Sequence, residues 1–482
     1  MNRILWLVTA IAILLAAIIL IVRARASRIA LRAVRRSGAR IDRFKLTRKS
    51  FIRDTLLADP AIAEAVAAHA TESAVTEEQT WKRVDAYIDE IVPFFNILTY
   101  YKLGLVVSRA LLDFFYKISA EYAGRESQLP KDSIVIYLMN HRSNADYVLV
   151  GYVLSGQVAI SYAVGEWARA FPLEYIFKSF GAYFIRRKYR EKLYHTVLEQ
   201  YVQLITRNGV TQGIFLEGGL SRDGKLGNAK IGLLDYVIGV ARDRQLTDRL
   251  YVVPVAVNYD RVLEDRSLLR ELDAREGRAR PPLLVQLGEV ARYVWWNLVR
   301  LVSRRWKRYG RAAVVIGEPI PLGPWLRDQH KATEDFFSIE KSRRLASVQS
   351  LADSVLGAIA QIIPVTPVPL ACAAIQSFDG DFIPHDLLIE RMREMRDVLH
   401  ELNARVIHRD GTVEEIFDRA WKMLSMRRIL VRSGNGYSVL PANRPLVSYY
   451  ANSISHLLGA FAQGVSERDR LPAVAAGAIR FV

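Results

Sequence analysis

Apolar and polar residues alternate in two different ways through the middle of the chain. From Ser133 onward, short runs rich in β-branched residues, the pattern of buried strands, are separated by segments whose apolar residues recur at helical spacing. The expected strands are 133–139, 157–164, 181–186, 211–217, 250–258 and 312–317, and the expected helices are 144–155, 166–179, 189–208 and 231–242. Strands that alternate with helices predict an α/β fold with helices on the faces of a sheet.

A helical pattern precedes this region. Between residues 23 and 120, apolar side chains recur at helical spacing, as at Val84 and Ile88, and a polar stretch containing Pro130 then marks a boundary. We therefore expect a basic helical N-terminal domain at 23–125 and the α/β domain at 126–330.

A mainly helical C-terminal domain is expected at 331–482, because helical spacing returns after Trp325. The exception is 427–440, where two arms of alternating apolar residues predict a hairpin with Asn435-Gly436 as its turn. No residue pattern in this region indicates a chemical step, so we expect it to act as a scaffold.

The N-terminus predicts a membrane anchor at 1–22. Residues 4–22 are apolar except for Thr9, and 19 residues of helix span about 28 Å, close to the thickness of one hydrocarbon core. A cleavable signal peptide is the alternative, since Ala24-Arg-Ala26 resembles a cleavage site, but signal cores are shorter. Residues 23–49 contain eleven Lys or Arg and one acid, which is +10 of the formal +17. This charge predicts a single-pass inner-membrane protein whose remaining domains are cytoplasmic.

The basic excess has a second interpretation, which is nucleic-acid binding. Its position directly after the expected span favours anionic lipid headgroups instead, and no zinc-finger spacing or basic-aromatic recognition motif is present. The single cysteine, Cys372, excludes an intramolecular disulfide.

Residues 283–308 combine apolar residues at helical spacing with arginines and the tryptophans Trp295, Trp296 and Trp306. This pattern fits an interfacial helix in the headgroup region, and it fits equally a core-facing helix with a solvated basic side.

A histidine and an aspartate follow the first expected strand. Residues 140–147 are Asn-His-Arg-Ser-Asn-Ala-Asp-Tyr, which places His141 five positions before Asp146. Five helical residues turn through about 500°, so the two side chains meet only if His141 lies on the turn and Asp146 begins the next helix. The aspartate can then hold one imidazole nitrogen while the other takes a proton from a hydroxyl group. A buried structural histidine beside a helix-start aspartate is the alternative.

Polar residues also follow two later strands. Arg186 and Arg187 end the strand at 181–186, where guanidinium groups suit a phosphate, although arginines in such positions are often simply solvated. Glu217 precedes Gly218 and Gly219, which allow the backbone to approach a ligand closely or to form a tight turn capped by the glutamate.

These blocks occur in an order that resembles the glycerolipid acyltransferases. The order is 140–147, 181–187, 215–222 and then Val252-Val-Pro-Val255. Further stretches resemble the glycerol-3-phosphate and dihydroxyacetone-phosphate acyltransferase branch of that family: Lys230-Ile-Gly-Leu-Leu234, Tyr259-Asp-Arg-Val-Leu263, Gly317-Glu-Pro-Ile320, Val365-Thr-Pro-Val368 and Tyr450-Ala-Asn-Ser453. The resemblance covers residues 130–460 and implies a mixed α/β sheet flanked by helices.

The resemblance implies a role for each block. His141 would be the general base and Asp146 its orienting partner. The residues that would hold the acceptor and its phosphate are Arg186, Arg187, Glu217, Gly218, Gly219, Ser221 and Arg222, with Arg186 first among the phosphate ligands. The implied reaction moves a fatty acyl group from acyl-CoA or acyl-acyl-carrier protein, as co-substrate, to the 1-hydroxyl of glycerol 3-phosphate. No cofactor and no metal are expected, because no histidine falls in a ligand-spaced cluster.

The chain departs from this branch at Leu220, where such enzymes usually have an arginine. One phosphate-binding cation is therefore missing or supplied from elsewhere, which leaves lysophosphatidate or another lysolipid as an alternative acceptor. A non-catalytic membrane scaffold or lipid-binding protein is the alternative from another class. A hydrolase is disfavoured because no Gly-x-Ser-x-Gly elbow is present. Pro254 predicts an edge strand, a bulge or a pocket wall.

Overall fold

The computed structural model describes residues 43–94, 105–123, 129–130, 132–155, 158–165, 169, 173–186, 189–275, 308–332 and 336–459. The expected anchor at 1–22 lies outside these residues, and so does the pattern at 283–308 except for Arg308. Among the helices that are described, none combines the length and the apolar composition that a membrane span requires.

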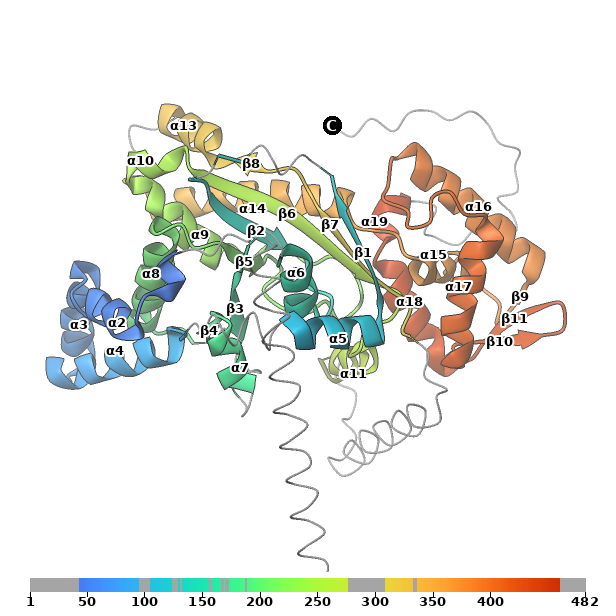
Figure 1. Ribbon diagram of the computed structural model, residues 1–482, viewed down its shortest axis with the longest axis horizontal. Coiled ribbons are helices and arrows are strands. Elements are labelled where there is room, and N and C mark those ends of the chain that lie inside the picture. The colour runs from blue at the N-terminus through green and yellow to red at the C-terminus, as the bar shows by residue number, and fades with distance from the viewer. Residues whose placement is uncertain are drawn as a thin grey trace, which may run out of the picture. The chain divides into compact units, whose positions relative to one another are not determined.

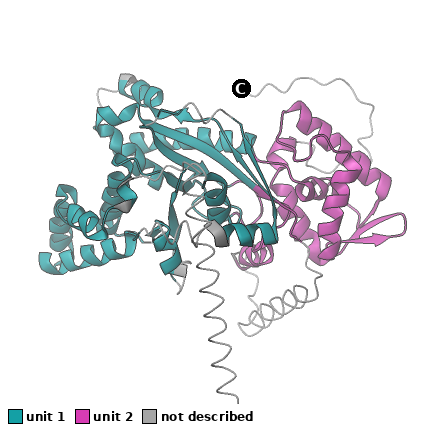
Figure 2. Ribbon diagram, in the orientation of Figure 1, with its two compact units in different colours: residues 1–220, 227–257, 312–362 teal, residues 221–226, 258–311, 363–482 magenta. Residues whose placement is uncertain are grey.

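The chain forms two compact units, which Figure 2 colours separately. Unit 1 comprises Met1–Leu220, Gly227–Val257 and Ala312–Ile362, and unit 2 comprises Ser221–Leu226, Asn258–Arg311 and Ile363–Val482.

Unit 1 is built around a mixed sheet, eight-stranded in the described residues, with strand order β1-β7-β6-β2-β5-β3-β4 and with β8 paired to β6 (Figure 1). The strands are β1 (Lys117–Tyr122), β2 (Ile134–Met139), β3 (Ser161–Gly165), β4 (Tyr183–Ile185), β5 (Gln212–Phe215), β6 (Leu250–Tyr259), β7 (Arg311–Ile316) and β8 (Ile320–Pro321). The pairs β2–β5, β2–β6, β3–β4 and β3–β5 are parallel, whereas β8 is antiparallel to β6. The predicted mixed α/β sheet is confirmed.

Burial explains why the central strands could be recognised. Every residue of β2, β3 and β5 is buried, as expected for parallel strands covered on both faces, and β2 is an unbroken apolar run. The register pairs Met139 with Phe215, the last residues of β2 and β5. The residues that follow these two strands therefore start from adjacent positions on one sheet edge.

Two groups of helices flank the sheet (Figure 1): α5 packs on α6 and β1, and α8 packs on α9, which contacts α14. The helices of this region are α5 (Leu105–Phe115), α6 (Asp146–Leu154), α7 (Leu173–Ser179), α8 (Lys192–Arg207), α9 (Gly232–Ile238), α10 (Arg244–Thr247), α13 (Leu322–Ala332) and α14 (Lys341–Gln361), with a 3₁₀ turn, η5, at Gly239–Arg242.

The N-terminal helices cover the α8 side of unit 1. They are η1 (Arg43–Leu46), α2 (Lys49–Leu57), α3 (Pro60–Ser73) and α4 (Glu77–Ile91). α4 begins with a capping box between Thr76 and Gln79 and packs its apolar face against α8 and β4. The helical pattern is thus observed in these segments, but residues 117–120, expected to be helical, belong to β1. Strand β1 is half-exposed and pairs with β7, a partner so distant in sequence that local periodicity cannot reveal it.

Pro254 lies in an interior strand, so the edge-strand interpretation was wrong. β6 runs between β7 and β2, and Pro254 is the register partner of Leu138. The proline lacks an N–H, but its carbonyl accepts a hydrogen bond from Gly317 N at 2.8 Å. At this position β6 therefore lacks one hydrogen-bond donor but keeps its acceptor.

Unit 2 consists mainly of helices around α15, nine of whose ten residues are buried. Its elements are α11 (Asp265–Arg275), α15 (Pro367–Gln376), β9 (Phe382–Pro384), α16 (His385–Glu401), α17 (Val413–Met426), β10 (Leu430–Ser433), β11 (Gly436–Val439), η6 (Pro441–Asn443), α18 (Arg444–Asn452) and α19 (Ser455–Leu458). Helices α16, α17 and α18 all pack against α15.

The predicted hairpin is confirmed as β10–β11, but its turn is one residue earlier than expected. Ser433 pairs with Gly436, so Gly434 and Asn435 form the turn. Gly434 has φ +53°, which suits the first position of a two-residue turn. Gly436 instead allows β9 to approach, because a Cβ there would lie 2.2 Å from Ile383 O.

Candidate active site

The turn after β2 brings His141 and Asp146 together. β2 ends at Met139 and α6 begins at Asp146, so the histidine lies on the turn and the aspartate in the first helical turn. His141 Nδ1 lies 2.9 Å from Asp146 Oδ2, and neither side chain is more than 1% exposed. The spacing of the pair thus produces the contact that acid–base chemistry requires.

Asp146 is held as a hydrogen-bond acceptor by three donors. Besides the histidine, Oδ2 accepts from the backbone N–H of Arg142 at 2.7 Å and of Ser143 at 3.0 Å. Because Oδ2 accepts from two backbone N–H groups, we expect it to act as an acceptor toward the imidazole as well. We therefore assign the proton to Nδ1 of a neutral His141 ring, which places the basic lone pair on Nε2.

Aromatic rings fix the orientation of the imidazole. The His141 ring stacks on Phe215, with centroids 3.9 Å apart and an interplanar angle of 25°. Tyr147 approaches edge-on, with its centroid at 5.5 Å. Phe215 ends β5 and Tyr147 is the second residue of α6, so two elements of unit 1 position the ring.

Glu217 links two segments of the chain: the turn that contains His141 and the loop that contains Gly227. Its Oε1 accepts from His141 N at 2.8 Å and its Oε2 from Gly227 N at 2.7 Å. Burial raises the pKa of this carboxyl to about 6, against the two backbone hydrogen bonds. Gly218 follows with φ +68° and donates its N–H to Phe215 O, and Gly219 continues the same turn. Sequence reasoning expected a turn or a ligand contact here and did not predict the hydrogen bond from His141 N to Glu217.

Asn140 is a positioning residue that sequence reasoning missed. Its side chain donates to Val257 O at 3.0 Å and accepts from Val257 N at 2.8 Å, so it continues the β2–β6 ladder beyond the end of β2. The signal available in the sequence was an asparagine directly after an apolar strand, and the structure shows that its side chain is buried.

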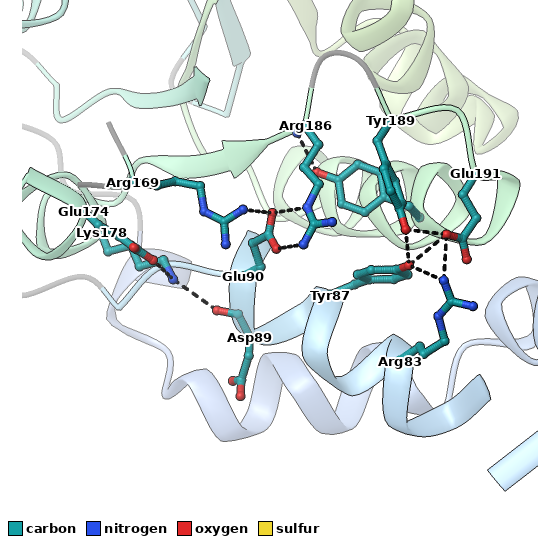
Figure 3. A network of polar contacts seen from close by, with 11 residues as sticks. Arg83, Tyr87, Asp89, Glu90, Arg169, Glu174, Lys178, Arg186, Tyr189 and Glu191 are labelled. Atoms are coloured by element: carbon teal, nitrogen blue, oxygen red, sulfur yellow. Dashed lines mark hydrogen bonds and ion pairs between the residues drawn. The ribbon is translucent and has the colours of Figure 1, made fainter. Parts of the chain in front are cut away.

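Arg186 lies after β4 and binds Glu90 of α4 (Figure 3). Its Nε and Nη2 donate to the two carboxylate oxygens at 2.7 and 2.5 Å. Its neighbour Arg187 lies outside the described residues. The phosphate-binding role expected of these arginines remains a prediction.

Ser221 and Arg222 belong to unit 2. Ser221 Oγ donates to Lys225 O at 2.7 Å, and Arg222 Nε donates to Glu271 at 3.0 Å. Their acceptor-binding role also remains a prediction.

Metal ligands and a reactive thiol are not evident in the described part of the chain. No group of three His, Cys, Asp or Glu side chains there could hold a metal ion. Burial raises the pKa of the Cys372 thiol well above its ordinary value, which disfavours the thiolate.

Two family models match the chain. An acyltransferase model matches residues 122–258, and a model of the glycerol-3-phosphate acyltransferase C-terminal region matches residues 295–462.

The curated relatives agree with these models. A glycerol-3-phosphate acyltransferase from Glaesserella parasuis serovar 5 is 26% identical over 392 residues, covering 79% of this chain and 46% of the relative. One from Hamiltonella defensa subsp. Acyrthosiphon pisum is 29% identical over 345 residues, covering 68% of this chain and 40% of the relative. The chain thus spans less than half the length of either relative.

Among solved structures, a 1-acyl-sn-glycerophosphate acyltransferase from Thermotoga maritima is similar, at 16% identity and a TM-score of 0.29. The match covers 64% of this chain and 98% of that one. A score this low supports no detailed comparison.

The matches and the motifs fall in the same places. The first model spans His141, Asp146 and Glu217, and the second spans 365–368 and 450–453. The chain is therefore similar to the glycerol-3-phosphate acyltransferase branch of the glycerolipid acyltransferases, in agreement with the resemblance of its motifs.

Proposed function

We propose that this protein is a membrane-bound O-acyltransferase that moves a fatty acyl group from acyl-CoA or acyl-acyl-carrier protein to the 1-hydroxyl of glycerol 3-phosphate. The observation that carries the proposal is the contact of His141 Nδ1 with Asp146, which leaves Nε2 as the basic nitrogen. The names of the curated relatives support the acceptor.

The reaction then needs no covalent enzyme intermediate, because a thioester is already activated. His141 Nε2 takes the proton of the acceptor hydroxyl as its oxygen attacks the thioester carbonyl carbon. The tetrahedral intermediate collapses with cleavage of the C–S bond, and the imidazolium returns the proton to the leaving thiolate. Asp146 stabilises that imidazolium, and Glu217 keeps the turn in place through His141 N.

The test is an acylation assay of the purified protein with glycerol 3-phosphate, using acyl-CoA and acyl-acyl-carrier protein as separate donors. We expect lysophosphatidate as the product with at least one donor. Acylation of lysophosphatidate by a protein that leaves glycerol 3-phosphate untouched at every concentration would show that the proposed acceptor is wrong.

Leu220 supports a second candidate acceptor. An arginine here would add a charge-assisted contact of about 1.5–3 kcal/mol to a phosphate, whereas a leucine adds apolar surface that suits a lysolipid. Leu220→Arg should therefore lower the KM for glycerol 3-phosphate by roughly 10- to 100-fold at preserved kcat. Kinetics with both acceptors check this prediction, and a gain for lysophosphatidate alone would contradict it.

A further inference from the structure

Two arginines from different loops converge on one carboxylate of α4 (Figure 3). Glu90 Oε1 accepts from Arg169 Nη1 at 3.0 Å and from Arg186 Nε at 2.7 Å, and Oε2 accepts from Arg186 Nη2. Arg169 follows β3 and Arg186 follows β4, two parallel strands whose last residues, Gly165 and Ile185, are register partners. Both arginines therefore follow strands that end at the sheet edge that carries His141 and Glu217.

Arg186 is fixed in orientation by its surroundings. Its guanidinium carbon lies 4.9 Å from the ring centroid of Tyr189, 5.8 Å from that of Tyr87 and 6.0 Å from that of Tyr194. Glu90 accepts hydrogen bonds from Nε and Nη2, which lie on one edge of the planar guanidinium group. These two hydrogen bonds define the plane of the group. Within the described residues no hydrogen bond reaches Nη1, and the side chain is 27% exposed. Nη1 therefore keeps donors that Glu90 does not use, on a side chain that is partly exposed.

The three charges are layered in a way that suits an incoming anion. The Glu90 side chain is 8% exposed, whereas those of Arg186 and Arg169 are 27% and 37% exposed. The carboxylate lies on the inner side, the two cations lie toward solvent, and their sum is +1. Without the carboxylate, the two guanidinium groups would repel each other and separate.

We propose that Glu90 is a positioning residue that gathers Arg169 and Arg186 into one site for the phosphate group of the acceptor. This inference rests on the proposed function, and it adds Glu90 and Arg169 to the residues expected from sequence. Three strand spacings separate β4 from β2, roughly 14 Å, a distance that an arginine side chain and a three-carbon acceptor can bridge together.

Glu191 offers a matched control in the same network. Its Oε2 accepts from Arg83 at 3.1 Å, from Tyr87 at 2.9 Å and from Tyr189 at 2.6 Å (Figure 3). No hydrogen bond or ion pair of Glu191 in the described residues involves Arg169 or Arg186. Glu191→Gln therefore removes a charge at the same junction of α4 and α8, while the glutamine oxygen can still accept from Tyr87 and Tyr189, whose rings flank Arg186.

The experiment compares Glu90→Gln, Arg169→Gln and Glu191→Gln in the full-length protein. Calorimetric titration with glycerol 3-phosphate and with inorganic phosphate gives Kd, and steady-state kinetics gives KM and kcat. We expect Glu90→Gln and Arg169→Gln to raise the Kd for both probes and the acceptor KM about 10-fold, with kcat and the acyl-donor KM within about twofold. Glu191→Gln should leave every one of these constants within about twofold of wild type.

Three outcomes would overturn the inference. They are wild-type Kd values in Glu90→Gln, an equal loss of affinity in Glu191→Gln, and a wild-type protein that binds neither probe. If Glu90→Gln does not fold, as judged by thermal unfolding, the more exposed Arg169→Gln decides alone, and an unchanged Kd in that variant rejects the site. Binding that follows the expected pattern without any acylation of glycerol 3-phosphate would instead reject the proposed function and leave the phosphate site standing.

Discussion

At the scale of single residues, the candidate site depends on two carboxylates that accept hydrogen bonds from backbone N–H groups of the turn after β2. Asp146 accepts from three donors within six residues of chain, and Glu217 reaches the same turn through the N–H of His141. The His141 turn is therefore held from two sides. Removing the carboxylate of Asp146 or of Glu217 should disturb the position of His141 more than removing an equally buried apolar group of similar size.

The first prediction concerns the base itself. His141→Ala should lower kcat by about 10²- to 10⁴-fold with little change in acceptor KM, because general-base catalysis acts on the transition state. Asp146→Asn should be similarly damaging, since an amide can present its NH₂ group to the ring and favour the wrong tautomer. Steady-state kinetics on folded variants checks both. Near-wild-type turnover of His141→Ala would show that another group is the base.

The second prediction concerns the pH dependence of stability through Glu217. Burial raises the pKa of this carboxyl from 4.5 to about 6, so the folded protein binds the proton more tightly than the unfolded chain does. The resulting contribution to the free energy of unfolding is complete below pH 4.5 and is lost as the pH rises through 6. It amounts to at most about 2 kcal/mol.

Glu217→Gln removes this titration. The difference in free energy of unfolding between wild type and variant should therefore fall between pH 4 and pH 7. Glu191→Gln should give the opposite slope, but only below about pH 4.5, because the contribution of a carboxyl with a lowered pKa is lost as the pH falls. Burial opposes ionisation of Glu191, but hydrogen bonds from Tyr189 and Tyr87 and the charge of Arg83 hold its pKa below the ordinary value. Thermal unfolding between about pH 3 and pH 7 checks both, and a flat difference for Glu217→Gln would contradict the raised pKa.

Sequence reasoning predicted one contact of the candidate site, and that contact is local. His141 and Asp146 are five positions apart, so their contact follows from one turn and the start of one helix. Glu90 and Arg186 are 96 positions apart, and a glutamate on an amphipathic helix resembles a solvated residue until the fold places an arginine beside it. Glu217 was identified as a site residue, but its hydrogen bond to His141 N depends on the register of β2 and β5.

At the scale of elements, the later motifs of unit 2 bind one another. Asn258 Nδ2 donates to Pro364 O at 3.0 Å and to Ser453 Oγ at 3.2 Å. Asp260 accepts from Val368 N at 2.9 Å. Val262 N donates to the Tyr450 hydroxyl at 3.1 Å, so the stretches 259–263, 365–368 and 450–453 form one connected set of contacts, which gives these motifs a structural role.

Asp265 of α11 forms the buried polar centre of this set. Its carboxylate binds the Arg427 guanidinium at 2.6 and 2.9 Å and accepts from the Tyr450 hydroxyl. The Asp265 and Arg427 side chains are only 4% and 7% exposed. Removing one partner of such a pair leaves an uncompensated buried charge.

The third prediction follows from this arrangement. Asp265→Asn should reduce the free energy of unfolding by about 3–5 kcal/mol, whereas Tyr450→Phe should cost about 1–2 kcal/mol because the ion pair survives. Glu271→Gln on the same helix should cost at most about 1 kcal/mol, since the Glu271 side chain, which pairs with Arg222, is 54% exposed. Thermal unfolding of the three full-length variants gives the order, and equal losses in all three would contradict a buried centre.

Long apolar elements were predicted well, and short half-exposed ones were not. The expected strand at 250–258 differs from β6 by one residue, because its buried positions form a continuous run. Strands β1, β8 and β9 were missed: β1 has no fully buried residue, β8 has two residues and β9 has three. Pairing with distant strands rather than local propensity determines such segments.

At the scale of the whole molecule, charge and hydropathy are concentrated at one end of the chain. Residues 23–49 contribute +10 of the formal +17 directly after the apolar run 4–22. Basic residues beside an anionic leaflet contribute about 1 kcal/mol each to membrane binding, a contribution that salt screens. We propose that the apolar run anchors the protein in the inner membrane and that the basic segment holds the acyltransferase region on the cytoplasmic side.

The last prediction separates these two contributions. A variant lacking residues 1–22 should be extracted from membranes by high salt, whereas the full-length protein should require detergent, because only the electrostatic attachment remains after truncation. Replacing 4–22 with an unrelated apolar sequence of equal length is the control and should restore the detergent requirement. Fractionation of membranes at low and high salt measures both. If the truncated protein still requires detergent, a second apolar attachment exists and residues 283–308, with their three tryptophans, become the segment to test. Cleavage beyond residue 50 by protease added outside intact cells would contradict the cytoplasmic orientation.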